Sequence, residues 1–244
     1  MKLIQLNLWQ GKLVNQIEDL LNEERPDILC LQEVIDVPKG DGVIFYTVEE
    51  IRKQFKTPII FLSPVFTFHY MNRVANFCNG IITNYPIVRS ETIFTHESFV
   101  EKLDLAERET NMRNFQHATI DLPGKKLLHV LNHHGYRVAE HKNGDEKSLE
   151  QCQMIADYAS SLDGPVILTG DFNLVPDSAS IEKINEVLTN LTLKAKLKTT
   201  RTSLTRKTEA CDYIFVSKDI KVKSFKASDA VVSDHQALIL EFDI

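Results

Sequence analysis

The first 34 residues constrain the fold more than any other part of the chain. The run LIQLNLW at residues 3–9 alternates apolar and polar side chains, as a half-buried strand does. The run LVNQIEDLLNEE at 13–24 repeats leucine and isoleucine at helical spacing, and Pro26 ends it. Since ILCLQEV at 28–34 is again strand-like, the chain opens as strand, helix, strand, and we expect both strands in one sheet.

Strand-like runs continue along the chain, whereas helical patterns are few. Branched and aromatic runs predict further strands at 58–62, 66–71, 76–84, 115–122, 126–133, 165–170, 212–217, 221–226 and 236–242. Helical spacing predicts helices at 48–55, 148–162 and 177–188, the last with Asp177 as its N-cap. About eleven strands and four helices predict an α/β fold of two stacked sheets flanked by helices. Without a repeat or a flexible linker, residues 1–244 are expected to form a single domain.

Charge and cysteine content exclude several classes of protein. A formal net charge of −6 gives the chain no strong long-range attraction for polyanions, so any contact with nucleic acid must be local. The four cysteines form no C-x-x-C pair, which speaks against a zinc or redox motif and for reduced, buried thiols. Met1 leads directly into the first strand, and no apolar run approaches the roughly 20 residues of a membrane span, so we expect a cytoplasmic protein.

Polar residues recur at the ends of the predicted strands. They are Asn7, Glu33, Asn132, His134, Asp171, Asn173, Asp212, Asp234 and His235. Side chains at strand ends are fixed by a rigid sheet and remain open to solvent, which is where functional sites lie. Carboxylate and amide oxygens suit Mg²⁺ or Mn²⁺, and histidines add donors or a general acid. The set predicts phosphoester hydrolysis by metal-assisted attack of water, without a covalent nucleophile.

Each of these residues has a structural alternative when taken alone. Asn7 and Asp171 are typical of turns and caps. Glu33 is harder to explain structurally, because a carboxylate that follows the apolar run ILCL would be costly if it were buried without a partner. The joint pattern favours a functional site over a series of unrelated turns.

Seven ordered motifs resemble those of the endonuclease/exonuclease/phosphatase superfamily, whose fold is that of deoxyribonuclease I. They are LNLW, LQEV, NGIITNYPI, NHHG, GDFN, CDYIFVS and SDHQAL, and together they extend from residue 3 to residue 240. One such motif carries little weight, whereas seven in the same order are specific. The resemblance implies a four-layered α/β sandwich with two mainly antiparallel or mixed sheets, and a site at one end of both sheets.

The resemblance also implies a metal site and a reaction. Glu33 would ligate the metal, Mg²⁺ or Mn²⁺, with Asn7 beside it as ligand or phosphate contact and Asp234 completing the site. Asp171 would orient or deprotonate the attacking water, and Asn173 would hold a phosphoryl oxygen.

Two histidines and an arginine complete the implied set. His235, oriented by Asp212, would stabilise charge on the phosphoryl oxygens as an imidazolium. His134 would take the second histidine position. His133 is its alternative, since neighbours on a strand face opposite ways, and Asn132 would share the face of His134. Arg113 is a fainter match to a phosphate-facing basic residue.

Two segments remain open to more than one interpretation. The stretch LTLKAKLKTTRTSLTRK at 191–207 is basic and has no acid. It could track a nucleic-acid backbone, but we favour an edge strand with outward lysines that block aggregation. EKLDLAERETN at 101–111 is predicted to be a solvated helix or loop that borders the site next to Arg113.

The sequence therefore predicts a Mg²⁺-dependent phosphoester hydrolase. A phosphodiester is the expected substrate, and a nuclease acting on DNA or RNA is the first hypothesis. The alternative is a phosphodiesterase or phosphatase for small molecules or lipid headgroups, and a third, weaker reading is a non-catalytic binding module with the same fold. Salt dependence separates the first two, because cleavage of a polymer weakens steeply with salt. No protein partner is indicated.

Overall fold

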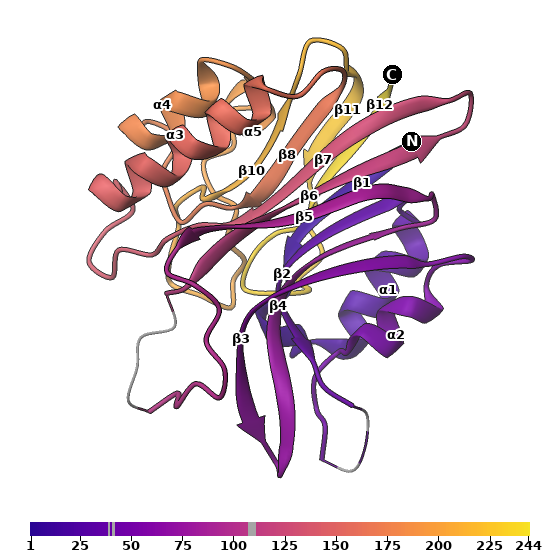
Figure 1. Ribbon diagram of the computed structural model, residues 1–244, viewed down its shortest axis with the longest axis vertical. Coiled ribbons are helices and arrows are strands. Elements are labelled where there is room, and N and C mark those ends of the chain that lie inside the picture. The colour runs from indigo at the N-terminus through magenta and orange to yellow at the C-terminus, as the bar shows by residue number, and fades with distance from the viewer. Residues whose placement is uncertain (39, 41, 107–110) are drawn as a thin grey trace.

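Two six-stranded sheets stacked face to face form the centre of the molecule (Figure 1). The structure, a computed structural model, describes residues 1–244 except 39, 41 and 107–110. The first sheet has the order β11 (Lys221–Ala227), β12 (Leu238–Asp243), β1 (Lys2–Asn7), β2 (Ile28–Asp36), β4 (Arg73–Thr83), β3 (Ile59–Tyr70). The second has the order β5 (Ile87–His96), β6 (Arg113–Leu122), β7 (Lys126–His134), β8 (Val166–Asp171), β10 (Asp212–Val216), β9 (Thr189–Asn190).

Helices cover the outer face of each sheet, which makes four layers. Helices α1 (Val14–Glu24) and α2 (Val48–Lys53) bury their apolar faces on the outer face of the first sheet. Helices α3 (Glu146–Ser160) and α4 (Ala179–Asn185) do the same on the second sheet, near the short α5 (Leu191–Lys194). A 3₁₀ turn, Trp9–Gly11, follows β1. The predicted four-layered α/β sandwich is confirmed.

Strand β1 shows how alternation places polar groups between the sheets. Ile4 and Leu6 pack outward toward α1, whereas Leu3 packs inward against the second sheet. Gln5 and Asn7 follow Leu3 on the inner face because side chains alternate along a strand. Both are buried. The inner face therefore becomes polar as the strand approaches its end.

A chain of side-chain amides ties the sheets together behind this end. Gln5 Nε2 donates to Gln32 Oε1 at 2.8 Å, and Gln32 Nε2 donates to Asn132 Oδ1 at 2.6 Å. Asn132 Nδ2 donates in turn to Gln116 Oε1 at 2.9 Å. None of the four side chains has measurable exposure. Asn132 thus joins the sheets deep in the interior, although it shares a face with His134.

Three expectations about elements are corrected. The basic stretch is not an edge strand: Asn190 caps the helix α5 by accepting from Leu193 N at 3.0 Å, and the chain beyond it is irregular. Ser178, not Asp177, caps α4.

The sequence analysis missed β5, an edge strand whose side chains are all at least partly exposed and whose pattern is largely polar. In addition, the runs at 58–62 and 66–71 are one strand, β3, with an irregularity between Pro64 and Phe66.

The 101–111 segment is only partly described, since 107–110 lie outside the described residues. Its described part contains turns and no helix, and Leu103 N donates to Thr67 O of β3 at 2.7 Å. Within the described part of the chain, no helix is both long and apolar enough to span a bilayer.

A histidine pair, the buried His117 and the half-buried His129, lies under α3 and away from the strand ends. His117 Nε2 and His129 Nδ1 are 2.9 Å apart, and His117 Nδ1 contacts the Tyr158 hydroxyl at 2.8 Å. Burial, followed by the neighbouring His129, lowers the pKa of His117 to about 4. His117 is therefore neutral in the folded protein at neutral pH.

This pair predicts a loss of stability on acidification. Between pH 6.5 and about 4 the unfolded chain can protonate His117, whereas the folded chain cannot, so the free energy of unfolding falls as the pH is lowered. The contribution of His117 is expected to be on the order of 2 kcal/mol. Urea unfolding of wild type and His117→Gln at pH 7.5 and pH 4.5 measures it. Equal losses in the two proteins would assign the acid sensitivity to other groups.

Candidate active site

The ends of six strands meet at one edge of the sandwich. Strands β1 and β2 are parallel, as are β7 and β8, so the carboxyl ends of each pair lie together. In the second sheet, Asp171 pairs in register with His134 on one side and Asp212 on the other. These three side chains form a row across β7, β8 and β10. The loop that enters β12 brings Asp234 and His235 to the same edge.

Two glycines allow β7 and β8 to meet this closely. A Cβ on Gly170 would lie 2.0 Å from His133 O, and one on Gly135 would lie 2.2 Å from Phe172 O. Both gaps are closed by backbone atoms, which cannot move aside as a flexible side chain can. The glycines of TGDFN and NHHG therefore permit the contact that puts His134 beside Asp171.

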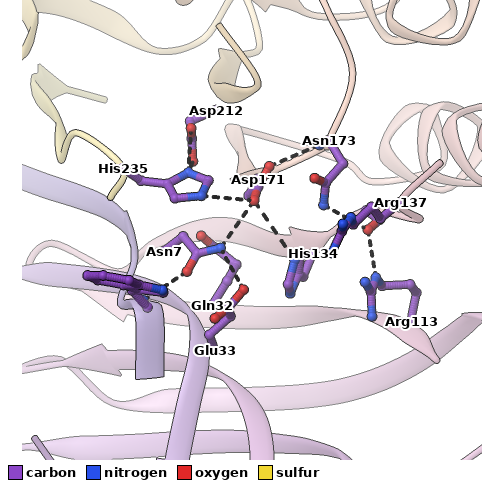
Figure 2. A network of polar contacts seen from close by, with 12 residues as sticks. Asn7, Gln32, Glu33, Arg113, His134, Arg137, Asp171, Asn173, Asp212 and His235 are labelled. Carbon is purple, nitrogen blue, oxygen red and sulfur yellow. Dashed lines mark hydrogen bonds and ion pairs between the residues drawn. The ribbon is translucent and has the colours of Figure 1, made fainter. Parts of the chain in front are cut away.

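Asp171 lies at the centre of the site (Figure 2). Its Oδ2 accepts from Asn7 Nδ2 at 3.1 Å, and it lies 3.6 Å from His235 Nε2 and 3.9 Å from His134 Nε2. Burial alone would raise the pKa of Asp171, but His235, Arg201 and His134 outweigh it and hold that pKa well below its ordinary value. Asp171 is therefore an ionised carboxylate, 2% exposed, with basic groups around it.

His235 is held by Asp212. Its Nδ1 lies 2.9 Å and 3.0 Å from the two Asp212 oxygens, so that Nε2 faces Asp171. Asp212 is itself fixed by Thr200 Oγ1, which donates at 2.6 Å, and by Gln5 Nε2, which donates at 3.2 Å. Burial would lower the pKa of His235, but Asp212 and then Asp171 raise it above its ordinary value.

Glu33 reaches the site through an irregularity in β2. The register between β2 and β4 shifts between Leu31 and Val34, and Glu33 has φ of 57°. The bulge lets Glu33 and its neighbour Gln32 both turn inward, where a regular strand would point one of them to the outer face. Burial dominates the pKa of Glu33 and raises it, even though His235 and the Asn7 amide act in the opposite direction.

The residues around Glu33 fit a hard divalent cation. Among the described residues, the half-buried Glu33 carboxylate accepts one hydrogen bond, from Asn7 Nδ2 at 3.3 Å. A cation beside a partly desolvated carboxylate would stabilise its charge. Asp234 lines the same cavity, and its Oδ1 lies 3.9 Å from His235 Nε2. Oxygen donors of this kind suit Mg²⁺ or Mn²⁺.

A second donor group lies deeper. Ligand atoms of Asp171, Asp212 and His235 fall within 4.8 Å of one another. Asp212 is fully buried, and its oxygens already accept from His235, Thr200 and Gln5. A cation there would have to displace these bonds and give up most of its waters, which Mg²⁺ does reluctantly. The side of the site at Glu33 is the better fit.

Asn173 follows Asp171 in a left-handed conformation, with φ of 57°. Its backbone N–H donates to Asp171 Oδ1 at 2.9 Å, and its Nδ2 donates to Gly135 O at 3.3 Å. Lys142 Nζ donates to its Oδ1 at 2.6 Å. Lys142 occupies the amide oxygen and Gly135 O accepts from one amide N–H, so the second N–H of Nδ2 is the donor left to meet an anion.

Basic residues surround the carboxylates. Arg113 is buried, with its Nε donating to Gly135 O at 2.6 Å. Burial lowers the pKa of Arg113 to about 10, so it remains charged at neutral pH. Arg201 is also buried and contacts both His235 Nε2 and, at 3.9 Å, Asp234 Oδ2. Arg137 and Lys207 line the cavity as well.

The structure brings the predicted residues together with two qualifications. His134 lines the cavity, whereas His133 Nδ1 donates to Asn114 O and its ring packs edge-on against Phe172, away from the cavity. Asp212 lies behind His235 and does not line the cavity. Sequence reasoning missed Arg201 and Lys142 as members of the site. Arg201 belongs to the basic stretch that was expected to be a strand, and Lys142 lies in a loop without a motif.

One cavity of about 760 Å³ lies at this edge of the sandwich. Its polar lining includes Glu33, His134, Asp171, Asn173 and His235. The rest of its lining is largely aromatic. The predicted border of the site by 101–111 is supported, since Leu105 and Asn111 also line the cavity.

Comparison with known sequences identifies one family. The family model described as Endonuclease/Exonuclease/phosphatase family matches residues 4–235. Among curated proteins, no sequence matches the chain significantly.

Solved structures share the fold at low sequence identity. The endonuclease/exonuclease/phosphatase from Bacteroides vulgatus is 18% identical, with a TM-score of 0.75 over 100% of this chain and 98% of that one. The mannosyl-6-phosphatase of Bacteroides thetaiotaomicron is 15% identical, with a TM-score of 0.70 and 100% of both chains covered. ANGEL2, a 2',3'-cyclic phosphatase, is 13% identical, with a TM-score of 0.68 over 99% of this chain and 94% of its own. At these identities the similarity establishes the fold and leaves the substrate open.

Proposed function

Because the chain belongs to the endonuclease/exonuclease/phosphatase family, we propose that this phosphoester hydrolase uses Mg²⁺, or Mn²⁺ in its place, and an attacking water to cleave a phosphodiester. The observation that carries the proposal is the position of Asp171. Its buried carboxylate contacts Asn7 and faces both His134 and His235, while Asn173 and Arg113 lie in the same cavity. A cytoplasmic location, expected from the sequence, also belongs to this proposal.

Each residue has a role that its contacts support. Asp171 is ionised and oriented by Asn7, so it accepts a hydrogen bond from the attacking water and aligns it with phosphorus. His235, held by Asp212 with a raised pKa, provides positive charge for the phosphoryl oxygens. Asn173 donates its amide N–H to another phosphoryl oxygen, and Arg113 adds a fixed charge. His134, whose pKa is lowered by burial and then by Arg113, donates as a neutral imidazole.

The metal would be held at Glu33, with Asn7 and Asp234 as the neighbouring oxygen donors. A bound divalent cation supplies positive charge to the phosphoryl oxygens, which makes phosphorus more electrophilic. Desolvation raises the pKa of Glu33, and a cation held there would favour the ionised carboxylate.

Two substrate classes compete. A nuclease acting on DNA or RNA is supported by the cationic lining of the cavity. The basic stretch, however, does not form one continuous face: Arg201 and Lys207 line the active-site cavity, whereas Lys194 lines a separate concave surface beside α4 and β10. A phosphodiesterase or phosphatase for small molecules or lipid headgroups is favoured by the concave shape and the size of the cavity.

Hydrolysis assays with purified protein separate these candidates. The substrates are single-stranded DNA, duplex DNA, RNA and bis(p-nitrophenyl) phosphate, each with Mg²⁺, Mn²⁺ or EDTA. Metal-dependent cleavage of a polymer that weakens steeply with salt supports the nuclease, and cleavage of the small diester alone supports the second class. Binding of phosphate esters without any turnover would instead indicate a non-catalytic module.

Removal of the metal is expected to abolish hydrolysis reversibly. EDTA should stop turnover, and added Mg²⁺ should restore it. Glu33→Gln should raise the Mg²⁺ concentration for half-maximal activity at least about tenfold, since it removes the charge of a proposed ligand. Glu23→Gln, on the exposed surface of α1, is the matched control. An unchanged Mg²⁺ requirement in Glu33→Gln would show that Glu33 is not the ligand and would assign the metal site to the deeper group at Asp171, Asp212 and His235.

A further inference from the structure

Part of the lining of the active-site cavity is not used by the proposed chemistry. Besides the polar residues, the cavity is lined by Trp9, Ile35, Phe45, Phe66, Phe68, Tyr70, Phe77, Leu105 and Ala139. Six of these nine residues are aromatic. We call the part of the cavity lined by these nine residues the aromatic recess.

The recess is built on the inner face of the first sheet. Ile35 pairs in register with Phe77, and Phe77 pairs with Phe66, so the three side chains form a row across β2, β4 and β3. Strands β3 and β4 extend past the other strands at the lower end of Figure 1. Phe66 and Phe77 stack at 4.9 Å with their rings nearly parallel, which makes a rigid floor.

Ring surfaces remain available above this floor. Phe45 and Tyr70 form a tilted pair with centroids 5.2 Å apart, and both are half-buried, as are Trp9 and Phe77. The Tyr70 hydroxyl donates to Gly42 O at 3.0 Å, which fixes its ring. Aromatic faces held in this way favour another flat ring through stacked or edge-to-face contacts.

The recess adjoins the proposed phosphate position along one strand. Ile35 is two residues beyond Glu33 on β2, so their Cα atoms are at most about 7 Å apart along the strand. One sugar unit can span that separation. The total volume of about 760 Å³ is typical of a site for one compact ligand and not for a duplex.

From this arrangement we infer that the aromatic recess binds a nucleobase carried on the phosphoester that is hydrolysed. The inference rests on the proposed function and specifies its substrate: a nucleotide ester whose phosphate meets Asn173 and His235 and whose base meets Phe45 and Tyr70. The base comes either from a free nucleotide ester or from the end of a single strand. An alkyl chain is disfavoured because the half-buried surfaces are ring faces held in place.

Esters with one leaving group test the recess. Thymidine 5'-(p-nitrophenyl phosphate), methyl p-nitrophenyl phosphate and octyl p-nitrophenyl phosphate all release p-nitrophenol and differ only in the retained group. With Mg²⁺ present, kcat/KM for the thymidine ester should exceed that for the methyl ester at least about tenfold, a factor within the range of base stacking on aromatic side chains. Equal values, or an octyl ester that matches the thymidine ester, would overturn the inference.

Variants at Phe45 assign the preference to the ring. Phe45→Leu keeps apolar bulk without an aromatic face, and should lose most of the preference for thymidine, measured as the ratio of kcat/KM for the thymidine ester to kcat/KM for the methyl ester. Phe45→Tyr should keep the preference. Ile44→Ala is the matched control. Ile44 is next to Phe45 in the chain, but its side chain is 68% exposed and does not line the cavity. A preference that survives in Phe45→Leu contradicts the inference.

A binding experiment separates failure of the inference from failure of the proposed function. Trp9 is the single tryptophan of the chain and lines the recess, so its fluorescence reports occupancy without turnover. Adenosine 5'-monophosphate should bind at least about tenfold more tightly than ribose 5-phosphate, which lacks only the base. Tight binding without hydrolysis of any ester would overturn the proposed function and support the recess. Hydrolysis of an ester together with equal binding of both ligands would support the proposed function and overturn the recess as a base-binding site.

The two sources of the base are distinguished by a third substrate. Single-stranded oligothymidylate and the thymidine ester are compared under the same conditions. Hydrolysis of the oligonucleotide from one end supports the recess as a site for a strand terminus, and hydrolysis of the thymidine ester alone supports it as a site for a free nucleotide.

Discussion

Asp171→Asn is expected to lower kcat at least about 10²-fold, which corresponds to about 2.7 kcal/mol of lost transition-state stabilisation. The asparagine keeps the shape of the side chain but removes the charge that faces His235 and His134. It also removes an oxygen that can accept a proton from water. Steady-state kinetics on the best substrate measures the effect, and circular dichroism checks that the variant is folded.

The matched control is the same substitution at an exposed position. Asp177→Asn lies outside the cavity, and its side chain is exposed. It should leave kcat within about twofold of wild type, since surface substitutions of this kind perturb little. A well-folded Asp171→Asn variant with near-normal turnover would disprove the assigned role of this carboxylate.

His235→Ala is expected to cause a second loss of at least about 10²-fold in kcat. The substitution removes the imidazole that connects Asp212 to the centre of the site. Folding should survive, because Asp212 still accepts from Thr200 Oγ1 and Gln5 Nε2. His69→Ala, on the exposed face of β3, is the control.

A double-mutant cycle tests whether Asp212 acts through His235. Asp212→Asn alone should lower kcat by changing the orientation and the protonation of the imidazole. Combined with His235→Ala, it should add little, because the two residues work as a unit. Independent, multiplying losses would contradict a positioning role for Asp212.

The layers and the strand ends could be predicted from the sequence because they follow from local periodicity. Alternation marks β1 as a strand and a run of branched apolar residues marks β8, and each strand ends in a polar side chain, Asn7 or Asp171, at the edge where function is expected. The ordered motifs then placed Glu33, His134 and His235 together. The structure agrees with this arrangement.

Other features depend on tertiary contacts that no local pattern records. Strand β5 carries Arg89 and Glu91 on an edge, so its sequence resembles a loop. The basic stretch 191–207 alternates like a strand, yet the cap at Asn190 turns Leu191 into a helix instead. Arg201 joins the site only because an irregular segment runs back to His235. The aromatic recess, likewise, requires the pairing of β2, β4 and β3, which the sequence alone does not specify.

The left-handed backbone conformations of Glu33 and Asn173 lower the stability of the fold at residues that the proposed activity needs. Both have φ of 57°, where glycine is comfortable and a side chain costs on the order of 1 kcal/mol, less for asparagine. Glycine at position 33 would also remove a half-buried carboxylate. A directed-evolution screen that selects only for thermal stability would therefore favour Glu33→Gly early and so lose the proposed metal ligand. Libraries of this protein need selection for turnover at every round.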